Sequence, residues 1–144
     1  MGAVKERRAA QYTAAIQARP TLGHMSRMTM DDHLMARIVA YIDHRLGDPD
    51  LCPPTIAAAH YLSIRGLYRM FEARGLSAAR YIRSRRLEKC RDELGSPGMT
   101  GVPVGVIAQR WGFRSCSHFS RVFLEEYGVS PAAYRKRGTE KKAA

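Results

Sequence analysis

The sequence contains few cysteines, no long apolar run and no useful stretch of strand-like alternation. Its three cysteines are odd in number and form no CxxC pair, so they indicate neither a disulfide framework nor a zinc site. No run of about 18 apolar residues is present, and charges interrupt residues 1–30, where a signal peptide needs an apolar centre. We therefore expect a chain that is not exported, resides in the cytoplasm and makes no membrane contact.

Positive charge, in contrast, is abundant and unevenly placed. The 144 residues carry a net charge of +11, and 45% of them are hydrophobic, which suffices for one compact domain or two very small ones. Residues 64–94 hold nine Lys or Arg against four Asp or Glu, and residues 110–137 hold six against two. Solvated helix faces account for many basic runs, but this concentration favours a polyanionic partner, most simply nucleic acid.

The two basic segments also repeat one pattern of residues. SIRGLYRMFEARGLSAARY, residues 63–81, shares Ser, Arg, Phe, Gly, Ser and Tyr positions with SCSHFSRVFLEEYGVSPAAY, residues 115–134. The offset between matched positions drifts from 51 residues, for Ile56 with Ile107, to 53, for Tyr81 with Tyr134, as short turn insertions between duplicated units would produce. A common core explains the matched Leu and Phe positions but not the arginine that lies between them twice, as Arg69 and Arg121.

Apolar spacing and capping residues predict an all-α fold of about seven helices. Asp31 or Asp32 is expected to cap the first helix, Thr55 the second and Ser63 the third. The expected helices span residues 31–46, 55–60, 63–73, 77–94, 104–111 and 115–127, with a last one from residue 130. GSPGMTG, residues 95–101, has the composition of a loop.

Each pair of short helices is typical of a helix-turn-helix, which needs a small residue at the helix crossing and a residue that tolerates positive φ in the turn. Ala108 and Gly112 meet both needs in the second unit. The first unit has Ala57 but carries Tyr61 in its turn, so that turn is expected to be either less regular or mildly strained.

The second helix of each unit is expected to present its polar face outward, where it can enter the major groove of DNA. The expected base-reading residues are Arg65, Tyr68, Arg69, Cys116, Ser117, His118 and Arg121. Arginine can form a bidentate contact with guanine, Ser117 and His118 can make single hydrogen bonds, and Tyr68 offers an apolar edge to a thymine methyl. The N-caps Ser63 and Ser115 place helix N-termini where a phosphate is favourable.

The motifs IAQRWGF, SHFSRVF and YGVSPAAYR, within residues 107–135, resemble the second helix-turn-helix of AraC/XylS-type transcription regulators. The segment IAAAHYLSIRGLYRMFEARGLSAARYIRSRRLEKCRDEL, residues 56–94, resembles their first helix-turn-helix and connecting helix. The resemblance covers residues 33–137. It implies two helix-turn-helix units, joined by a long linker helix, whose second helices enter successive major grooves on one face of duplex DNA.

The resemblance assigns the same base-reading positions and adds phosphate contacts. The phosphate-contacting candidates are Ser63, Arg80, Arg114, Ser115 and Arg135. Arg80 is included because of its charge and not because of the resemblance. The chain departs from the family at Tyr61 and at Arg65, where a large aromatic residue is often found, so the resemblance does not supply a sequence preference.

The expected parts of the chain follow from this assignment. They are a tail or linker remnant over residues 1–30, a first helix-turn-helix subdomain over 31–76, a linker helix over 77–95, a second helix-turn-helix subdomain over 96–137 and a basic tail over 138–144. The chain is either the DNA-binding part of a longer regulator with a sensor or dimerisation domain, or a stand-alone member. We expect a monomer that binds double-stranded DNA and regulates transcription, as an activator or as a repressor, with RNA polymerase as a candidate second partner.

Other functions explain less of the sequence. Ser115, Cys116 and His118 lie close together, but no carboxylate partner or Gly-rich phosphate loop accompanies them, so no enzyme and no catalytic residue is expected. Cys116 and His118 point roughly 200° apart on a helix, so no metal and no cofactor is expected. A non-specific nucleoid or RNA binder needs only the charge and remains the main alternative, ahead of a binder of acidic proteins.

Overall fold

The computed structural model describes residues 29–143, so the expected tail over residues 1–30 lies outside the described residues apart from its last two. The described part is helical, which confirms the expected all-α class. Its helices are α2 (Met30–His44), α3 (Pro53–Ala59), α4 (Ile64–Glu72), α5 (Ala78–Leu94), α6 (Val104–Arg110), α7 (Cys116–Tyr127) and α8 (Pro131–Ala143), with a 3-10 turn, η2, at Pro97–Met99.

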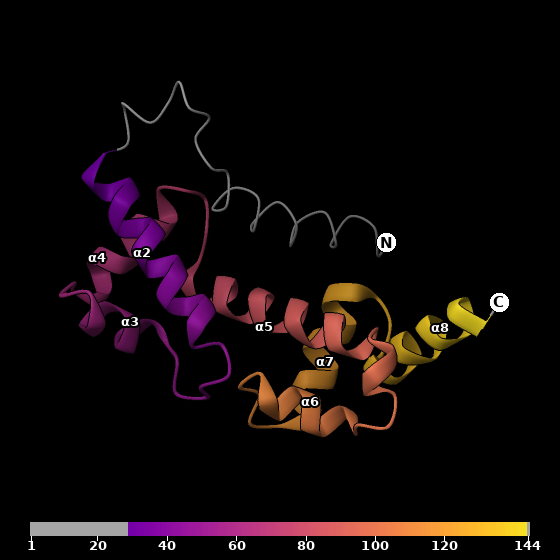
Figure 1. Cartoon of the computed structure of the whole chain (residues 1–144). Helices are drawn as coiled ribbons and strands as arrows, with labels where there is room; N and C mark the ends of the chain where they lie inside the picture. The colour runs from indigo at the N-terminus through magenta and orange to yellow at the C-terminus, as the bar shows by residue number, and fades with distance from the viewer. Residues whose placement is uncertain (1–28, 144) are drawn as a thin grey trace.

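The helices form two lobes that α5 joins. Figure 1 shows α2, α3 and α4 grouped at one end of α5, and α6, α7 and α8 grouped at the other. The last helix is continuous through Ala143, so it includes residues 138–143, the segment expected as a basic tail. The helix-turn-helix pairs are therefore α3 with α4 and α6 with α7.

Each lobe has its own hydrophobic core, and α5 contributes to both. Its first half buries Tyr81 and Ile82 among the residues of α2, α3 and α4. Its second half buries Leu87, Cys90 and Leu94 among the residues of α6 and α7. Because residues of one helix belong to both cores, α5 joins the two lobes through core packing.

Two helix starts differ from the sequence-based prediction. Thr29, and not Asp31 or Asp32, caps α2. Asp32 is the third residue of the helix, and its side chain completes a capping box with Thr29. The start of α3 lies at Pro53 and not near Thr55, since both prolines occupy the first turn, where a missing N–H costs nothing. The hydroxyl of Thr55 instead accepts a hydrogen bond from the backbone N–H of Cys52, at 3.1 Å.

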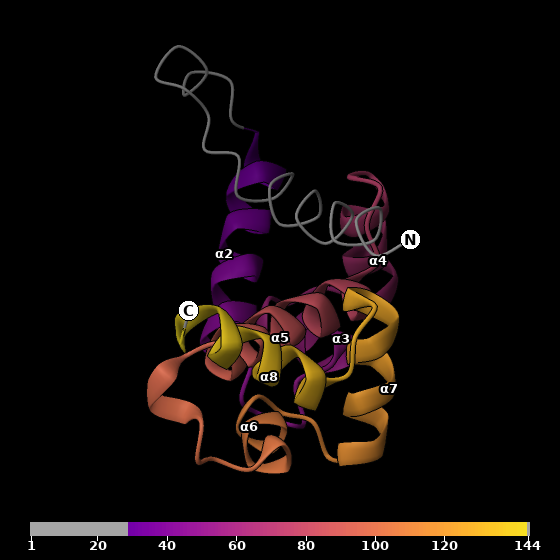
Figure 2. The same cartoon turned by 90° about the vertical axis from the view of Figure 1, so that its right-hand side faces the viewer.

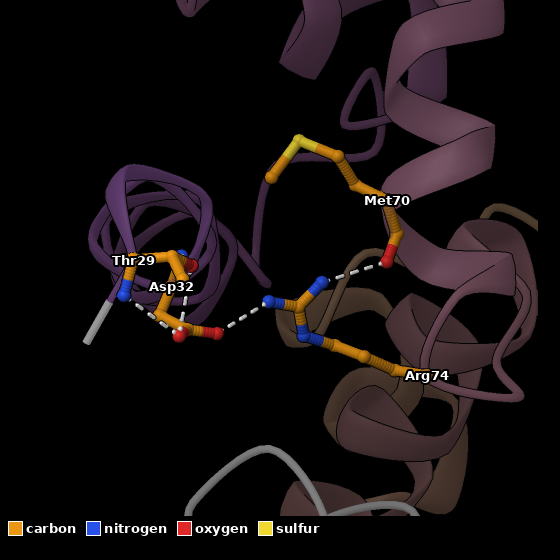
Figure 3. A network of polar contacts seen from close by, with 4 residues as sticks. All are labelled: Thr29, Asp32, Met70 and Arg74. Carbon is orange, nitrogen blue, oxygen red and sulfur yellow. Dashed lines mark hydrogen bonds and ion pairs between the residues drawn. The ribbon is translucent and has the colours of Figure 1, made fainter. Parts of the chain in front are cut away.

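A polar network attaches the start of α2 to the end of α4 (Figure 3). The Asp32 carboxylate accepts hydrogen bonds from the backbone N–H of Thr29 at 3.1 Å and from its hydroxyl at 3.0 Å. The Arg74 guanidinium donates to the same carboxylate at 3.0 Å and to the carbonyl oxygen of Met70 at 2.9 Å. The backbone hydrogen bond from Thr29 is the largest cause that lowers the pKa of Asp32, and Arg74 adds to it.

This network predicts an acid-sensitive contribution to stability. A carboxyl whose pKa is lower in the folded state stabilises the fold above its unfolded pKa of about 4, and the contribution disappears as the pH falls through the folded value. We expect the free energy of unfolding of the wild type to fall more steeply below about pH 4 than that of Asp32→Asn. Urea unfolding at a series of pH values measures this, and Asp31→Asn should retain the wild-type slope.

The two helix-turn-helix turns use the same backbone conformation with different residues. Tyr61 has a φ of 55° in the first turn, and Gly112 has a φ of 86° in the second. Of the two expectations for the first turn, mild strain is therefore correct, because a non-glycine residue occupies the left-handed region. The Tyr61 side chain is 97% exposed, so packing does not compensate for that strain.

Replacing Tyr61 by glycine should stabilise the protein. The left-handed conformation costs a non-glycine residue roughly 1–2 kcal/mol. Glycine loses roughly 0.5–1 kcal/mol through backbone entropy. The expected net gain is about 0.5–1 kcal/mol in the free energy of unfolding, measured by urea denaturation.

The reverse change at the matching position is the control. A Cβ on Gly112 would lie 2.7 Å from the carbonyl oxygen of Leu46. Gly112→Ala should therefore destabilise the protein through both strain and steric overlap. Equal and small effects at Tyr61 and Gly112 would contradict the interpretation of the turns.

Candidate nucleic-acid interface

The two helices expected to read bases lie on the same side of the molecule. Figure 2, which looks roughly along α5, shows α4 and α7 at the same lateral edge. Both helices begin at a serine cap: the Ser63 hydroxyl accepts from the N–H of Gly66 at 3.0 Å, and the Ser115 hydroxyl accepts from the N–H of His118 at 3.2 Å. Both predicted caps are confirmed.

The outward face of α4 carries the residues expected from the sequence. Leu67 and Phe71 are fully buried, and this orientation leaves Arg65, Tyr68 and Arg69 exposed. Neither guanidinium group has a hydrogen bond or an ion pair within residues 29–143, so both are available to a ligand.

The outward face of α7 is more polar. Phe119 and Phe123 are fully buried, and the expected reading residues are exposed: they are Cys116, Ser117, His118 and Arg121. The Arg121 guanidinium lies 3.1 Å from Nδ1 of His118. Because a guanidinium can only donate, Nδ1 is the acceptor and the neutral imidazole carries its proton on Nε2.

Other arginines in the two basic segments, residues 64–94 and 110–137, have structural partners. Arg85 pairs with Asp43 on α2 and with Glu88 on its own helix. Arg110 forms an ion pair with Glu93 at 2.8 Å, which connects α6 to α5. Part of the basic charge that indicated a polyanion therefore stabilises the fold itself.

The phosphate-contacting candidates differ in whether their side chains already have partners within the fold. Ser63, Ser115 and Arg80 are exposed, and Arg80 has no hydrogen bond or ion pair among the described residues. Arg114 forms an ion pair with Asp50. Arg135 donates to the carbonyl oxygens of Val102 at 2.6 Å and Thr100 at 3.4 Å, so it fastens the loop before α6.

The cysteines and histidines form no second kind of site in the described residues. Burial raises the pKa of the Cys90 thiol to about 12, which makes it unreactive as a nucleophile. Within residues 29–143, no group of three His, Cys, Asp or Glu side chains is arranged to hold a metal ion. None of the helices in this range has the length and apolar character needed to cross a membrane.

Comparison with known proteins identifies the family. A model of the helix-turn-helix domain matches residues 56–137, more than half of the chain. The chain belongs to the AraC/XylS-type helix-turn-helix family. The matched range begins in α3 and ends in α8, so it contains both helix-turn-helix pairs and the linker helix.

Relatives and solved structures agree with this assignment. The transcriptional activator NphR of a Rhodococcus species is 35% identical over 102 residues, which cover 71% of this chain and 30% of that protein. The activator RhaR of Pectobacterium carotovorum is 40% identical over 79 residues, covering 54% of this chain and 27% of that protein. The chain thus spans about a third of the length of the curated relatives that it matches.

The fold is that of the C-terminal domains of larger regulators. The C-terminal domain of AraT, a response regulator from Geobacillus stearothermophilus, superposes with a TM-score of 0.69 at 28% identity, covering 76% of this chain and 88% of that one. The C-terminal domain of the response regulator yesN from Fusobacterium nucleatum has a TM-score of 0.67 at 23% identity, covering 72% and 98%, and shows the fold alone.

One junction connects the two lobes of this AraC/XylS-type domain, and sequence reasoning missed it. Arg86 on α5 donates through Nε to the carbonyl oxygen of Leu46 at 2.9 Å and through a terminal nitrogen to that of Asp48 at 2.6 Å. A Cβ on Gly112 would lie 2.8 Å from Nε of Arg86. The side chain is therefore enclosed between the loop after α2 and the turn of the second helix-turn-helix.

A second close approach supports the same junction. A Cβ on Gly47 would lie 2.8 Å from the carbonyl oxygen of Arg110, so the loop after α2 contacts the end of α6 directly. Burial is the largest effect on the Arg86 guanidinium and lowers its pKa. The only sequence signal for this contact was the presence of Gly47 and Gly112. Glycine allows another part of the chain to approach closely, but the sequence does not say which part approaches.

A basic groove of about 380 Å³ lies beside this junction. Its lining comes from the loop after α2, the first half of α5 and the start of α7, and it includes Arg83, Arg86, Arg114 and His118. The groove thus extends from the junction of the lobes to the first turn of α7.

Replacing Arg86 should weaken the junction. Arg86→Met removes two hydrogen bonds from a charged donor while keeping an unbranched side chain, so we expect a loss of about 2–4 kcal/mol in the free energy of unfolding. Arg83→Met is the matched control, because Arg83 is exposed on the same helix and lines the same groove. Its effect should stay within about 0.5 kcal/mol. Urea denaturation of both variants measures the difference, and equal losses would contradict the role of Arg86.

Proposed function

We propose that this chain binds double-stranded DNA in a sequence-specific way and regulates transcription. The observation that carries the proposal is the placement of two capped, arginine-bearing helices, α4 and α7, on one side of a fold whose lobes are fixed to each other. An exposed helix fits the major groove, and two such helices on one side can enter successive grooves.

The roles of individual side chains follow from their exposure. Base reading is assigned to the seven exposed residues of α4 and α7 named above. Phosphate contact is assigned to Ser63, Ser115 and Arg80, and to Arg114 and Arg135 in addition to their structural contacts. The basic groove beside the start of α7 suits the DNA backbone between the two half-sites, because positively charged side chains line it.

The curated relatives support the regulatory role. NphR and RhaR are both named as transcriptional activators, so we propose activation as the outcome of binding. The functional parts of the chain would be a first reading subdomain over residues 31–76, a linker helix over 77–95 and a second reading subdomain over 96–137.

The remaining assignments concern the setting in which the chain acts. We propose a cytoplasmic, nucleoid-associated monomer, since one chain already holds two reading helices, with RNA polymerase as a second partner. No catalytic role is proposed. Ser115, Cys116 and His118 lie at the exposed start of α7, and among the described residues no carboxylate forms a hydrogen bond or an ion pair with their side chains. A sensor or dimerisation domain belongs to the proposal only for a longer parent protein.

A non-specific nucleic-acid binder is the alternative that the charge alone would allow. The two functions differ in what they predict for a random duplex library. Selection at near-physiological salt should enrich two short sequence blocks with centres about one helical turn apart if both helices read bases. Binding without enrichment that weakens steeply with salt would support the non-specific alternative.

Base reading predicts selective losses on substitution. Arg69→Ala and Arg121→Ala should each weaken binding to the selected site by about 1–3 kcal/mol and relax the preference at one or two base pairs. Their binding to scrambled duplex should change much less, as measured by fluorescence anisotropy titrations.

Arg80→Ala is the matched control for a phosphate contact. It should weaken binding to selected and scrambled duplex alike and reduce the salt slope by about one. Equal losses on both duplexes for Arg69→Ala or Arg121→Ala would remove that residue from the base-reading set.

A further inference from the structure

The reading faces of α4 and α7 differ in chemistry although the helices are copies of one motif. On α4, Ile64 and Tyr68 lie one helical turn apart, and each is 43% exposed. Residues four apart share a helix face, so the two side chains form one apolar edge beside Arg65 and Arg69. Tyr68 was predicted from the sequence as an apolar contact, whereas Ile64 was not.

The matching positions of α7 carry small side chains. Cys116 replaces Ile64 and Ser120 replaces Tyr68 when the two helices are aligned on their serine caps. The one large apolar side chain exposed on α7 is Leu124, which lies about two turns further from the N-terminus than Cys116. The N-terminal turns of α7 therefore lack an apolar edge comparable to that of α4.

These turns of α7 instead present hydrogen-bond donors. The Arg121 guanidinium donates a hydrogen bond to Nδ1 of His118. The other ring nitrogen, Nε2, therefore carries the proton and points away from Arg121. The Arg121 guanidinium has further N–H groups that the histidine does not use. The pair is thus a prearranged set of donors with no free ring acceptor.

In the major groove, an apolar face and a face of hydrogen-bond donors favour different bases. The thymine methyl is the apolar group that a base pair displays there, and guanine displays two adjacent acceptors, N7 and O6. An apolar edge gains from burying a methyl group, and a donor pair gains from two acceptors on one base.

Building on the proposed function, we propose which base each reading helix of this chain recognises. The half-site under α4 contains a thymine whose methyl group packs against Ile64 and Tyr68. The half-site under α7 contains a guanine whose N7 and O6 accept from His118 and Arg121. These two base assignments define the asymmetric site.

Single-atom changes in the DNA test this proposal. The duplex selected by the full chain is first divided into halves, since Arg69→Ala relaxes one half and Arg121→Ala the other. Each thymine is then replaced by deoxyuridine, which removes only the methyl, and each guanine by 7-deazaguanine, which removes only the N7 acceptor. Binding of every duplex is measured by anisotropy titration at one fixed salt concentration.

The expected results are specific to each half. One deoxyuridine in the α4 half should raise Kd roughly three- to fivefold. Deoxyuridine in the α7 half should have little effect. One 7-deazaguanine in the α7 half should raise Kd roughly 10- to 100-fold.

Two protein variants link these effects to the named side chains. Tyr68→Ala should reduce the deoxyuridine effect in the α4 half, because only Ile64 remains to contact the methyl, and leave the 7-deazaguanine effect in the α7 half intact. Arg121→Ala should reduce the 7-deazaguanine effect in the α7 half, because only His118 remains to donate, and leave the deoxyuridine effect in the α4 half intact. Both side chains are exposed, so both variants should keep the wild-type melting temperature, which is measured in parallel.

The outcomes separate this proposal from the proposed function. A selected site whose α4 half tolerates deoxyuridine at every thymine, or whose α7 half tolerates 7-deazaguanine at every guanine, would overturn the asymmetric site while leaving sequence-specific binding in place. A wild-type chain that selects no sequence at all would overturn both proposals.

Discussion

The contact of Arg86 with the carbonyl oxygens of Leu46 and Asp48 is the constraint on which the arrangement of the two reading helices depends. Core packing places α5 in both lobes, but a helix shared by two small cores still allows one lobe to rotate about its axis. The guanidinium resists that rotation, because it is held by two carbonyl groups of the first lobe and lies against the glycine turn of the second. A fixed angle between the lobes gives two helices on one side a defined spacing, which is what recognition of two successive grooves requires.

The arginines of this chain divide between holding the fold and facing a ligand. Arg74, Arg85, Arg86 and Arg110 have carboxylate or carbonyl partners, whereas Arg65, Arg69 and Arg80 have none within residues 29–143. These three lie on α4 and on the first turn of α5, and Arg37, Arg83 and Arg137 are exposed on other parts of the surface. The number of arginines therefore overstates how much positive charge is available to DNA, and net charge gives no indication of where that charge lies.

The sequence predicted the class, the order of the helices and the orientation of α4 and α7, because caps and apolar spacing are local signals. Ser63 and Ser115 lie directly before the helices that they cap, and Phe71 and Phe123 identify the buried faces. The start of α3 was misplaced because two prolines can belong either to a turn or to a first helical turn. The junction around Arg86 was not predictable, since its partners lie 40 and 38 residues away in the chain and nothing local distinguishes it from Arg83.

The surroundings of each turn, and not the helix-turn-helix motif itself, decide which residues its left-handed position tolerates. Gly112 has no freedom, because the carbonyl oxygen of Leu46 and the side chain of Arg86 occupy the space where a Cβ would lie. Tyr61 adopts the same left-handed conformation, yet its side chain extends into solvent, so only backbone strain opposes a larger residue there. The first unit lies outside the junction at this point and the second lies within it. We infer that the two copies have diverged into readers of different sequences while sharing one packing scheme.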